Sequence, residues 1–519
     1  MVVTDSPIPL FPRRTEALAQ LIKDVTVLPS LLLIANLAAP CESLQALALP
    51  DTTIVSATLV PEGPFTPPTP QGSTAAPRPL QVKGACRVVG RISPAVNFEV
   101  WLPASNWNGK FQMVGGGGFA GVISYGAMAT ALNRGYATAS TDTGHSTPGG
   151  AWALGHPELV IDYAYRAIRE TTLKSKAIVE TFYGNAPSKS YFVGCSTGGR
   201  QGLMEAQRFP NDYDGIVAGA PANFFTHLMV GSLWVGTAAP REGTTLSARE
   251  FDLLNKEAIK ACDAKDGVTD GLIANPPECQ FDPQVTQCLG TSGDGCLTPA
   301  QVRAAKRIYS PAVNTRTNEV LFPGMPPGSE ATWAALAGER PFSIPADFFK
   351  YFVYENAEWD WRRMDFDKDV AALDAKYAAM LNAVDPDLSA FKARGGKLIM
   401  YHGWNDQLIQ AGNSIDYYTS VIRKMGARET DDFARLFMAP GMLHCAGGVG
   451  PNTFDAVTAL EQWVEHGQRP SELIASHMAN GVVDRTRPLC PYPQVAVYKG
   501  SGSIDEAASF TCQLRASRP

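Results

Sequence analysis

Short apolar strands alternate with amphipathic helices along two parts of the chain, up to residue 224 and again from residue 393. The helix expected over residues 162–184 has apolar residues at helical spacing and ends at Gly184. Strands that alternate with helices predict a mostly parallel sheet covered by helices, an α/β fold. The expected strand-like runs are FQMV (111–114), ATAST (137–141), SYFVGC (190–195), DGIVAGAPA (214–222), KLIMYHG (397–403) and FARLFMA (433–439).

The alternation of strands and helices is interrupted between residues 225 and 392. This segment is predicted to form helices and loops, and it holds four cysteines and many aromatic residues. A sheet interrupted by a long insertion indicates one domain that carries a second. We therefore predict a catalytic domain of residues 1–224 and 393–519 and an inserted lid domain of residues 225–392. The proline-, threonine- and serine-rich residues 50–80 predict a loop or an exposed extended segment.

The sequence Gly194-Cys195-Ser196-Thr197-Gly198 fits the pattern G-x-S-x-G. An apolar strand ends at the serine and a helix begins just after it, which is the setting of a nucleophile elbow in α/β-hydrolases. The simpler alternative is a glycine-rich turn in which Ser196 caps a helix.

A nucleophilic serine needs a base and an orienting acid, which in this fold follow the serine in the order acid, then histidine. Asp406 follows the strand KLIMYHG, and His444 follows the strand FARLFMA. We predict these as the acid and the base, with a structural turn as the alternative for Asp406. Of the other histidines, His402 is expected to pack or to make a structural hydrogen bond, and His145 could line the site.

Backbone N–H groups must stabilise the oxyanion that forms during attack on a carbonyl. One is expected from Thr197, directly after the serine, and another from the glycine loop 115–121. A phosphate-binding loop is the rival interpretation of these glycines, but the GK[ST] ending is missing.

Composition narrows the classes of partner. The 44 Lys and Arg residues and 50 Asp and Glu residues leave a net charge of −6, and no basic run suggests a nucleic-acid partner. No apolar run reaches the roughly 18 residues of a membrane span. Residues 25–40 could be the apolar region of a signal peptide or a first core helix. The sequence carries no signature of a particular oligomeric state.

Ten cysteines without a CxxC motif favour disulfides and an oxidising compartment, although buried thiols are an alternative. Cys195 precedes Ser196 and Cys445 follows His444, so a disulfide between them would tie the two catalytic loops together. Three local pairs also read as disulfides: Cys262 with Cys279, Cys288 with Cys296, and Cys490 with Cys512.

The motifs GCSTGGRQG, YHGWNDQ, PGMLHCAGG and RTRPLCPYP resemble the tannase and feruloyl esterase family, which includes a mono(2-hydroxyethyl) terephthalate hydrolase. The resemblance runs from about Cys41 to Cys512. It implies an α/β-hydrolase core with an inserted lid. It further implies the triad Ser196, Asp406 and His444, oxyanion donors Gly118 and Thr197, and, beside the pairs above, a disulfide Cys41–Cys86.

A short acidic loop between Cys262 and Cys279 suggests a metal site. Carboxylates spaced by glycines suit Ca²⁺, and a solvated acidic turn is an equal alternative from the residues alone. The resemblance implies a structural calcium held by Asp263, Asp266, Asp270 and the carbonyls of Val268 and Leu272. No organic cofactor is expected.

Together these features predict a secreted or periplasmic serine carboxylic ester hydrolase. The resemblance implies small-molecule esters of aromatic acids, of feruloyl, galloyl or terephthalate type. Alternatives are an esterase for non-aromatic esters and a catalytically silent binding protein of the same fold. Arg362 or Arg363 could meet a substrate carboxylate, or simply lie on the surface. The aromatic residues of the insertion could form a substrate slot, although we favour the core of the lid for most: Trp333, Phe348, Phe349, Tyr351, Phe352, Trp359 and Trp361.

Overall fold

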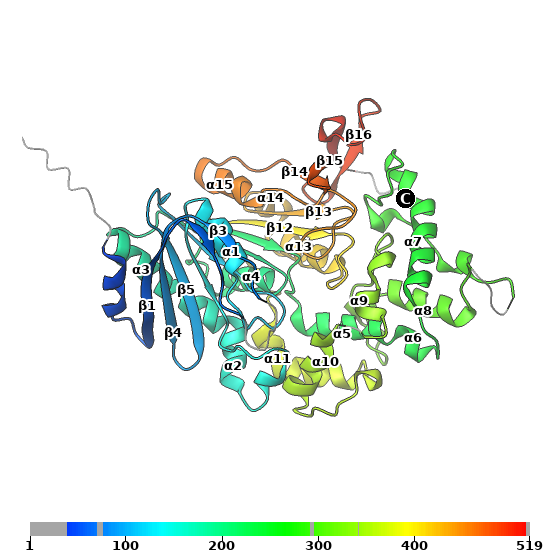
Figure 1. The fold of residues 1–519 in the computed structure, drawn as a ribbon. Coiled ribbons are helices and arrows are strands. Elements are labelled where there is room, and N and C mark those ends of the chain that lie inside the picture. The colour runs from blue at the N-terminus through cyan, green and yellow to red at the C-terminus, as the bar shows by residue number, and fades with distance from the viewer. Residues whose placement is uncertain (1–38, 70–75, 291–294, 341, 515–519) are drawn as a thin grey trace, which may run out of the picture. The chain divides into compact units, whose positions relative to one another are not determined.

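In the described part of the chain, residues 39–69, 76–290, 295–340 and 342–514 of a computed structural model, nine strands form one sheet (Figure 1). Their spatial order is β1-β4-β5-β7-β6-β8-β9-β12-β13. The predicted segment 25–40 lies almost wholly outside the described residues. The strands are β1 (Thr52–Val60), β4 (Ala85–Ile92), β5 (Val96–Pro103), β7 (Ala137–Thr141), β6 (Lys110–Val114), β8 (Lys189–Cys195), β9 (Gly215–Gly219), β12 (Lys397–Gly403) and β13 (Ala434–Ala439).

Six of these strands, from β7 to β13 in the spatial order, pair in parallel, whereas β1, β4 and β5 form an antiparallel edge. The predicted mostly parallel sheet is therefore confirmed. Parallel strands bring their carboxyl ends to one edge of the sheet, where ligands bind in open α/β folds. The loops after β6, β8, β12 and β13 all begin at this edge.

Helices cover both faces of the sheet, so strand side chains are buried on both sides. Successive residues of β8 show this: Tyr191 belongs to an apolar cluster that includes residues of α1 and α15, and Phe192 belongs to a different cluster that includes residues of α3, α4 and α13. The predicted end of α3 is confirmed, since Gly184 caps it with a φ of 73°. These helices are α1 (Tyr125–Asn133), α3 (Ala167–Tyr183), α4 (Thr197–Arg208), α13 (Gly412–Met425) and α15 (Ala456–His466).

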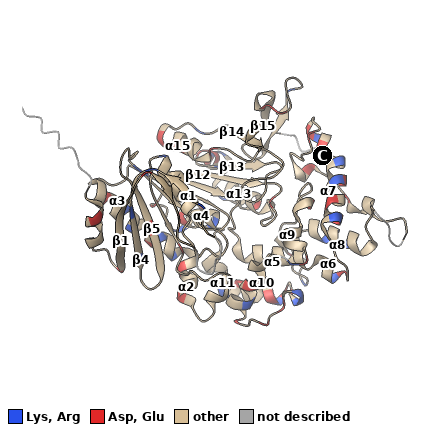
Figure 2. Cartoon of the chain, in the orientation of Figure 1, with Lys and Arg blue, Asp and Glu red and all other residues tan. Residues whose placement is uncertain are grey.

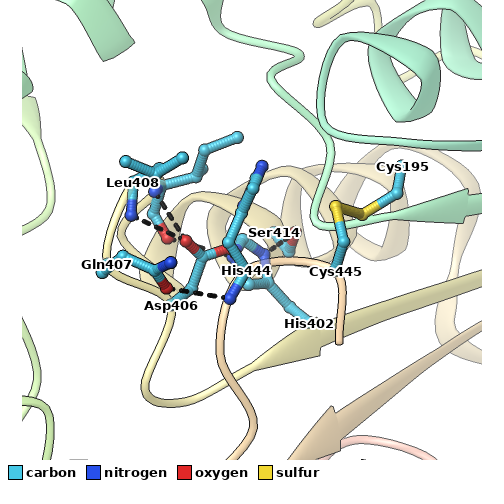
Figure 3. Close-up of a disulfide and its surroundings, with 9 residues drawn as sticks. Cys195, His402, Asp406, Gln407, Leu408, Ser414, His444 and Cys445 are labelled. Atoms are coloured by element: carbon cyan, nitrogen blue, oxygen red, sulfur yellow. Dashed lines mark hydrogen bonds and ion pairs between the residues drawn. A yellow bond between two sulfur atoms is a disulfide. The ribbon is translucent and has the colours of Figure 1, made fainter. Parts of the chain in front are cut away.

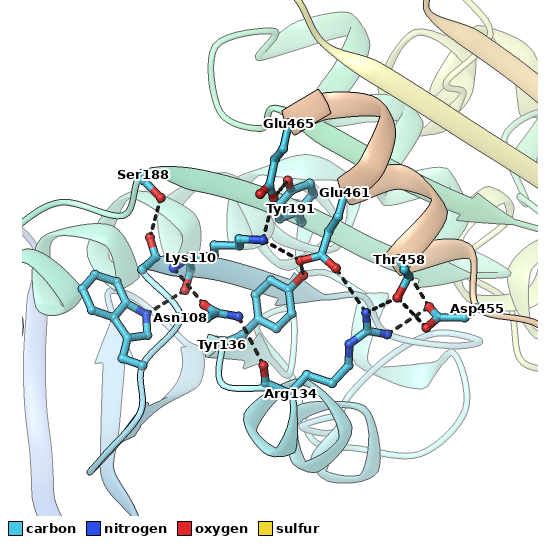
Figure 4. Close-up of polar contacts among 12 residues, drawn as sticks. Asn108, Lys110, Arg134, Tyr136, Ser188, Tyr191, Asp455, Thr458, Glu461 and Glu465 are labelled. Atoms are coloured by element: carbon cyan, nitrogen blue, oxygen red, sulfur yellow. Dashed lines mark hydrogen bonds and ion pairs between the residues drawn. The ribbon is translucent and has the colours of Figure 1, made fainter. Parts of the chain in front are cut away.

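A polar network fastens α15 to the sheet (Figure 4). The ammonium group of Lys110 on β6 lies 2.9 Å from a carboxylate oxygen of Glu461 and 2.6 Å from one of Glu465. Tyr191 on β8 donates to Glu465 at 2.5 Å, and Tyr136 donates to Glu461. Because α15 follows the loop that carries His444, this network supports one side of the site.

The segment between β9 and β12 adds no described strand to the nine-stranded sheet. It consists mainly of helices and loops, as predicted, and β10 and β11 pair in a separate two-stranded sheet. Its assignment as a separate lid domain stays a prediction. On α7 acidic and basic residues are interspersed (Figure 2). The elements are α5 (Phe225–Gly236), α6 (Ala238–Arg241), α7 (Ala248–Cys262), α8 (Pro299–Tyr309), β10 (Ala312–Val313), β11 (Val320–Phe322), α9 (Ala334–Ala337), α10 (Ser343–Asp347), α11 (Lys368–Leu381) and α12 (Ser389–Ala393).

Residues 50–80, predicted as a loop or exposed extended segment, contain a full strand of the sheet. The run TTIVSATLV forms β1 at the sheet edge, paired with β4. Its β-branched residues favour a strand, and the proline-rich part begins only after it. The short strands β2 (Gly63–Phe65) and β3 (Leu80–Val82) pair with each other. The remaining elements are α2 (Pro157–Ile161), α14 (Ala427–Asp431), β14 (Leu473–Ala479), β15 (Val482–Leu489), β16 (Gln494–Tyr498) and β17 (Phe510–Leu514).

All ten cysteines lie in described residues, and all are paired. Among the described helices, none is long and apolar enough to cross a bilayer. The disulfides are Cys41–Cys86, Cys195–Cys445, Cys262–Cys279, Cys288–Cys296 and Cys490–Cys512.

Candidate active site

Ser196 lies in the tight turn between β8 and α4, at the carboxyl edge of the sheet. Its backbone is in a strained region, with φ 64° and ψ −125°. The turn is held by the Ser196 N–H, which donates to the Gly219 carbonyl at 2.9 Å. A Cβ atom at Gly194 would lie 2.5 Å from the Gly198 backbone, so the first position of the G-x-S-x-G pattern needs glycine. This is the geometry of a nucleophile elbow.

Asp406 and His444 form a hydrogen-bonded pair on the loops after β12 and β13 (Figure 3). His444 Nδ1 lies 2.8 Å from Asp406 Oδ2. The other carboxylate oxygen, Oδ1, accepts the N–H groups of Leu408 and Ile409 at 2.8 and 2.9 Å. Gln407 steadies the histidine loop, because its side-chain oxygen accepts the His444 N–H at 3.0 Å.

Asp406 is completely buried. Burial alone would raise the pKa of its carboxyl group, but hydrogen bonds from His402 and His444 outweigh burial and hold that pKa below its ordinary value. A carboxylate that stays ionised can orient an imidazole and stabilise its protonated form. The pair is therefore suited to general-base chemistry at His444.

The disulfide Cys195–Cys445 joins the serine turn to the histidine loop, with 5.9 Å between the two Cα atoms (Figure 3). Cys445 has a φ of 65°, in the left-handed region like that of Ser196. The disulfide thus joins the residue before Ser196 to the residue after His444, and one of its two cysteines, Cys445, is itself in a strained backbone position.

The glycine loop after β6 meets the start of α4. The Gly118 carbonyl accepts hydrogen bonds from the Thr197 hydroxyl at 2.6 Å and from the Tyr163 hydroxyl at 3.0 Å. Within the described residues, the backbone N–H groups of Gly118 and Thr197 have no protein acceptor. Both residues line the same cavity as Ser196, so these N–H groups could serve a developing oxyanion. Tyr163, which sequence reasoning missed, has no motif around it that could have revealed it.

A cavity of about 310 Å³ opens above Ser196 and His444. Seven of its lining residues come from the insertion, and no Lys, Arg, Asp or Glu is among the described residues that form it. Sequence reasoning missed this wall because α5 is mostly apolar and carries no motif. The insertion and β12–α13 loop residues that line it are Phe225, Leu228, Met229, Ser232, Phe342, Ile344, Pro345, Leu408 and Ile409.

Among the described residues, the Ser196 hydroxyl makes no hydrogen bond to His444, although both side chains line this cavity. Catalytic hydrogen bonds in ligand-free enzymes are often long and tighten only when substrate binds. The sequence-predicted serine, acid and base are therefore gathered at one site, with the acid–base bond already formed.

The aromatic residues proposed for a substrate slot do not line the cavity. Trp333, Phe348, Phe349 and Phe352 are at most 1% exposed and pack in the core of the insertion, as we favoured. Arg362 is exposed and lies 3.3 Å from a carboxylate oxygen of Asp360. It is a surface residue rather than a partner for substrate.

The acidic loop between Cys262 and Cys279 does not support the predicted calcium site. Both carboxylate oxygens of Asp263 accept backbone N–H groups, from Asp270 and Gly271. Asp270 is buried and its Oδ2 lies 2.7 Å from the Arg487 guanidinium. In the described part of the chain, no group of three or more His, Cys, Asp or Glu side chains is arranged to hold a metal ion. Asp263 and Asp270 are thus engaged within the protein, and nothing further distinguishes Asp266 or the Val268 and Leu272 carbonyls as ligands.

Comparison with known proteins gives one consistent result. A family model described as tannase and feruloyl esterase matches residues 80–513. An esterase of Xanthomonas campestris pv. campestris, named as uncharacterized, is 38% identical over 96% of this chain and 95% of its own length. A protein of Aspergillus fumigatus named probable feruloyl esterase B-2 is 35% identical over 82% of this chain and 86% of its own.

Solved structures agree. The crystal structure of feruloyl esterase B from Aspergillus oryzae has a TM-score of 0.87 and 32% sequence identity, and covers 91% of this chain and 99% of its own. A tannin acyl hydrolase from Aspergillus niger, with a TM-score of 0.77 and 24% identity over 92% of this chain and 94% of its own, shares the fold.

Proposed function

The chain belongs to the tannase and feruloyl esterase family of carboxylic ester hydrolases, and on this basis we propose that it is a serine esterase for esters of aromatic acids. Ser196 is the proposed nucleophile, His444 the base and Asp406 the orienting acid. One observation carries the proposal. His444 is hydrogen-bonded to Asp406 at 2.8 Å, and His444 lines the same cavity as Ser196, the serine of the nucleophile elbow.

The reaction proceeds through an acyl-enzyme. The Ser196 oxygen attacks the ester carbonyl while His444 Nε2 takes its proton, and Asp406 stabilises the imidazolium through Nδ1. The N–H groups of Gly118 and Thr197 hold the oxyanion of the tetrahedral intermediate. His444 then protonates the departing alcohol, and a water activated by His444 releases the acid from Ser196.

The insertion acts as a lid on an α/β-hydrolase core. This is supported by α5 and α10, which belong to the insertion and form much of the cavity wall above the serine. In this proposal the core supplies the chemistry and the lid supplies the acyl pocket.

The wall of the cavity favours an uncharged acyl group. A carboxylate buried there would have no cationic partner, and burying an unpaired charge costs several kcal/mol. The Ser232 hydroxyl donates to the Leu228 carbonyl at 2.9 Å, so its oxygen can accept a hydrogen bond from a phenol. Feruloyl esters fit this wall better than terephthalate half-esters do.

Five disulfides support a protein that matures in an oxidising compartment, secreted or periplasmic. The predicted calcium has no part in the reaction above, and a metal analysis of the purified protein would test whether the loop 262–279 holds any.

The test is turnover of four esters by the wild type, Ser196→Ala and the control Ser188→Ala. The esters are methyl ferulate, methyl gallate, mono(2-hydroxyethyl) terephthalate and a short aliphatic p-nitrophenyl ester. We expect Ser196→Ala to lose about 10⁴-fold or more in kcat, and Ser188→Ala, an exposed serine before β8, to keep wild-type rates. For the wild type, kcat/KM for the terephthalate half-ester should be about 100-fold below that for methyl ferulate.

Other outcomes would redirect the proposal. Activity on the aliphatic ester alone would keep the triad and discard the aromatic substrate. Wild-type rates in Ser196→Ala would refute the serine mechanism, and no turnover of any ester would favour the silent binding protein.

A further inference from the structure

A second histidine contacts the candidate catalytic aspartate. His402 lies near the end of β12, four residues before Asp406, and is completely buried (Figure 3). Its Nε2 atom lies 3.1 Å from Asp406 Oδ2 and 3.0 Å from the Ile409 carbonyl oxygen. Its Nδ1 atom lies 2.7 Å from the Ser414 hydroxyl oxygen at the start of α13.

The partners of His402 determine where its proton lies. A carboxylate oxygen and a carbonyl oxygen can only accept, so Nε2 must carry a hydrogen. The Ser414 hydroxyl can donate to Nδ1, which leaves a neutral ring in a defined tautomer. His402 is thus a fixed donor aimed at Asp406.

His402 and His444 share one acceptor atom. Both lie within hydrogen-bonding distance of Oδ2, while Oδ1 is occupied by two backbone N–H groups. The titratable groups that face Asp406 among the described residues are His402, from β12, and His444, from the loop after β13. The negative charge of Asp406 therefore attracts His444 less strongly while His402 also donates a hydrogen bond to the same oxygen.

We propose that His402 is a positioning residue of the reaction, which holds the Asp406 carboxylate in place and moderates its pull on His444. The inference rests on the proposed function, because it assumes that His444 is the base. Two physical effects follow. Without the His402 donor the carboxylate is still held at Oδ1 by two backbone N–H groups, but its orientation towards His444 is less firmly fixed, which lowers kcat. The carboxylate that remains also favours protonated His444 more strongly, which moves the acid limb of the pH–rate profile to higher pH.

The experiment compares His402→Leu, which removes the donor, with His402→Gln, whose amide N–H can reach the carboxylate. We expect His402→Leu to lower kcat about tenfold, with KM within about twofold of wild type, as for the loss of one hydrogen bond to a charged group. Its acid limb should rise by about 0.5–1 pH unit. His402→Gln should restore most of kcat and return the acid limb towards wild type.

His227 offers a matched control. It has the same two kinds of partner, the Asp374 carboxylate at 2.8 Å and the Leu321 carbonyl at 2.8 Å, but lies in the insertion and contacts neither Asp406 nor His444. His227→Leu should lower the melting temperature and leave the acid limb where it is. A loss of stability by itself would thus be separated from a change at the triad.

The outcomes are distinct. A folded His402→Leu with wild-type kcat and acid limb overturns the inference, as does a His402→Gln that behaves like His402→Leu. If His402→Leu does not fold, Ser414→Ala takes its place. This variant removes the hydrogen bond that holds the His402 ring from its Nδ1 side, so the Nε2 donor is aimed less firmly at Asp406. The limb should then shift in the same direction, and an unshifted limb overturns the inference. Ser196→Ala measured in the same series shows whether the serine mechanism itself has failed.

Discussion

Removing the disulfide between the two catalytic loops should cost both stability and rate. The perturbation is the double variant Cys195→Ala/Cys445→Ala, in which alanine leaves no free thiol. The bridge closes a span of 250 residues, for which loop-closure entropy gives about 5 kcal/mol of stabilisation. The control Cys490→Ala/Cys512→Ala opens a span of 22 residues, worth about 3 kcal/mol on the same account.

The two variants should differ in rate as well as in stability. Two backbone positions at the bridge have positive φ angles: Ser196, next to the bridged Cys195, at 64°, and the bridged Cys445 itself, at 65°. Without the bridge these turns can relax, and misplacement of a reacting group by about 1 Å can cost about 100-fold in rate. We expect kcat to fall at least about tenfold in the first variant and to stay at the wild-type value in the control.

Urea unfolding under oxidising conditions gives the stability of each variant, and initial rates on methyl ferulate give kcat. The free energy of unfolding should be lower in the first variant than in the control by about 2 kcal/mol. A folded Cys195→Ala/Cys445→Ala protein with wild-type kcat would refute the reasoning, as would an equal loss of kcat in the control.

Two further predictions concern the oxyanion loop. Gly118 has a φ of 57°, and an added Cβ would lie 3.2 Å from the Ile344 Cδ1 atom. The variant Gly118→Ala should therefore destabilise the fold by about 1–2 kcal/mol and lower kcat more than it raises KM. Steady-state kinetics that show only a raised KM would contradict this prediction. Burial lowers the pKa of His145, whose Nε2 lies 2.6 Å from the Phe119 carbonyl oxygen, to about 4. The unfolded chain therefore binds one more proton between about pH 6.5 and 4, and stability that is present above this range is lost as pH falls. His145→Phe should flatten the dependence of unfolding free energy on pH in this window, and an unchanged slope in urea unfolding at several pH values would contradict the assignment.

The sequence was most informative where one residue type must sit at one backbone position. Gly194, Ser196 and Gly198 predicted the elbow because a tight turn from strand to helix needs these residues at this spacing. Asp406 and His444 could be chosen because each follows an apolar run that reads as a strand. The structure brings these two within 2.8 Å of each other, as their shared setting suggested.

Features without a local pattern could not be predicted. His402 was expected to pack or to make a structural hydrogen bond. Its contact with Asp406 depends on how the chain turns between β12 and α13, which no periodicity encodes. The aromatic residues of the insertion were candidates for the wall of the substrate cavity. In the structure, residues of α5 form much of that wall instead. An apolar helix reads the same whether it faces a core or a pocket, because both environments exclude water.

The acidic loop shows a third limit. Three aspartates in eight residues could bind a cation or satisfy the backbone of their own turn, and composition does not separate these uses. In the structure the Asp263 oxygens accept backbone N–H groups, and Asp270 meets Arg487 from β15, 217 residues later in the chain. Such a distant partner has no signature in the loop itself.

The order of the bridge along the chain bears on limited proteolysis. The whole insertion lies between Cys195 and Cys445, so a single cut anywhere within it leaves two fragments that remain one covalent molecule. One fragment would carry the proposed nucleophile and the other the proposed base, and only a reducing agent would release them. A protease in the surroundings could therefore nick this enzyme without parting its catalytic residues, and the nick would be visible on a gel only after reduction.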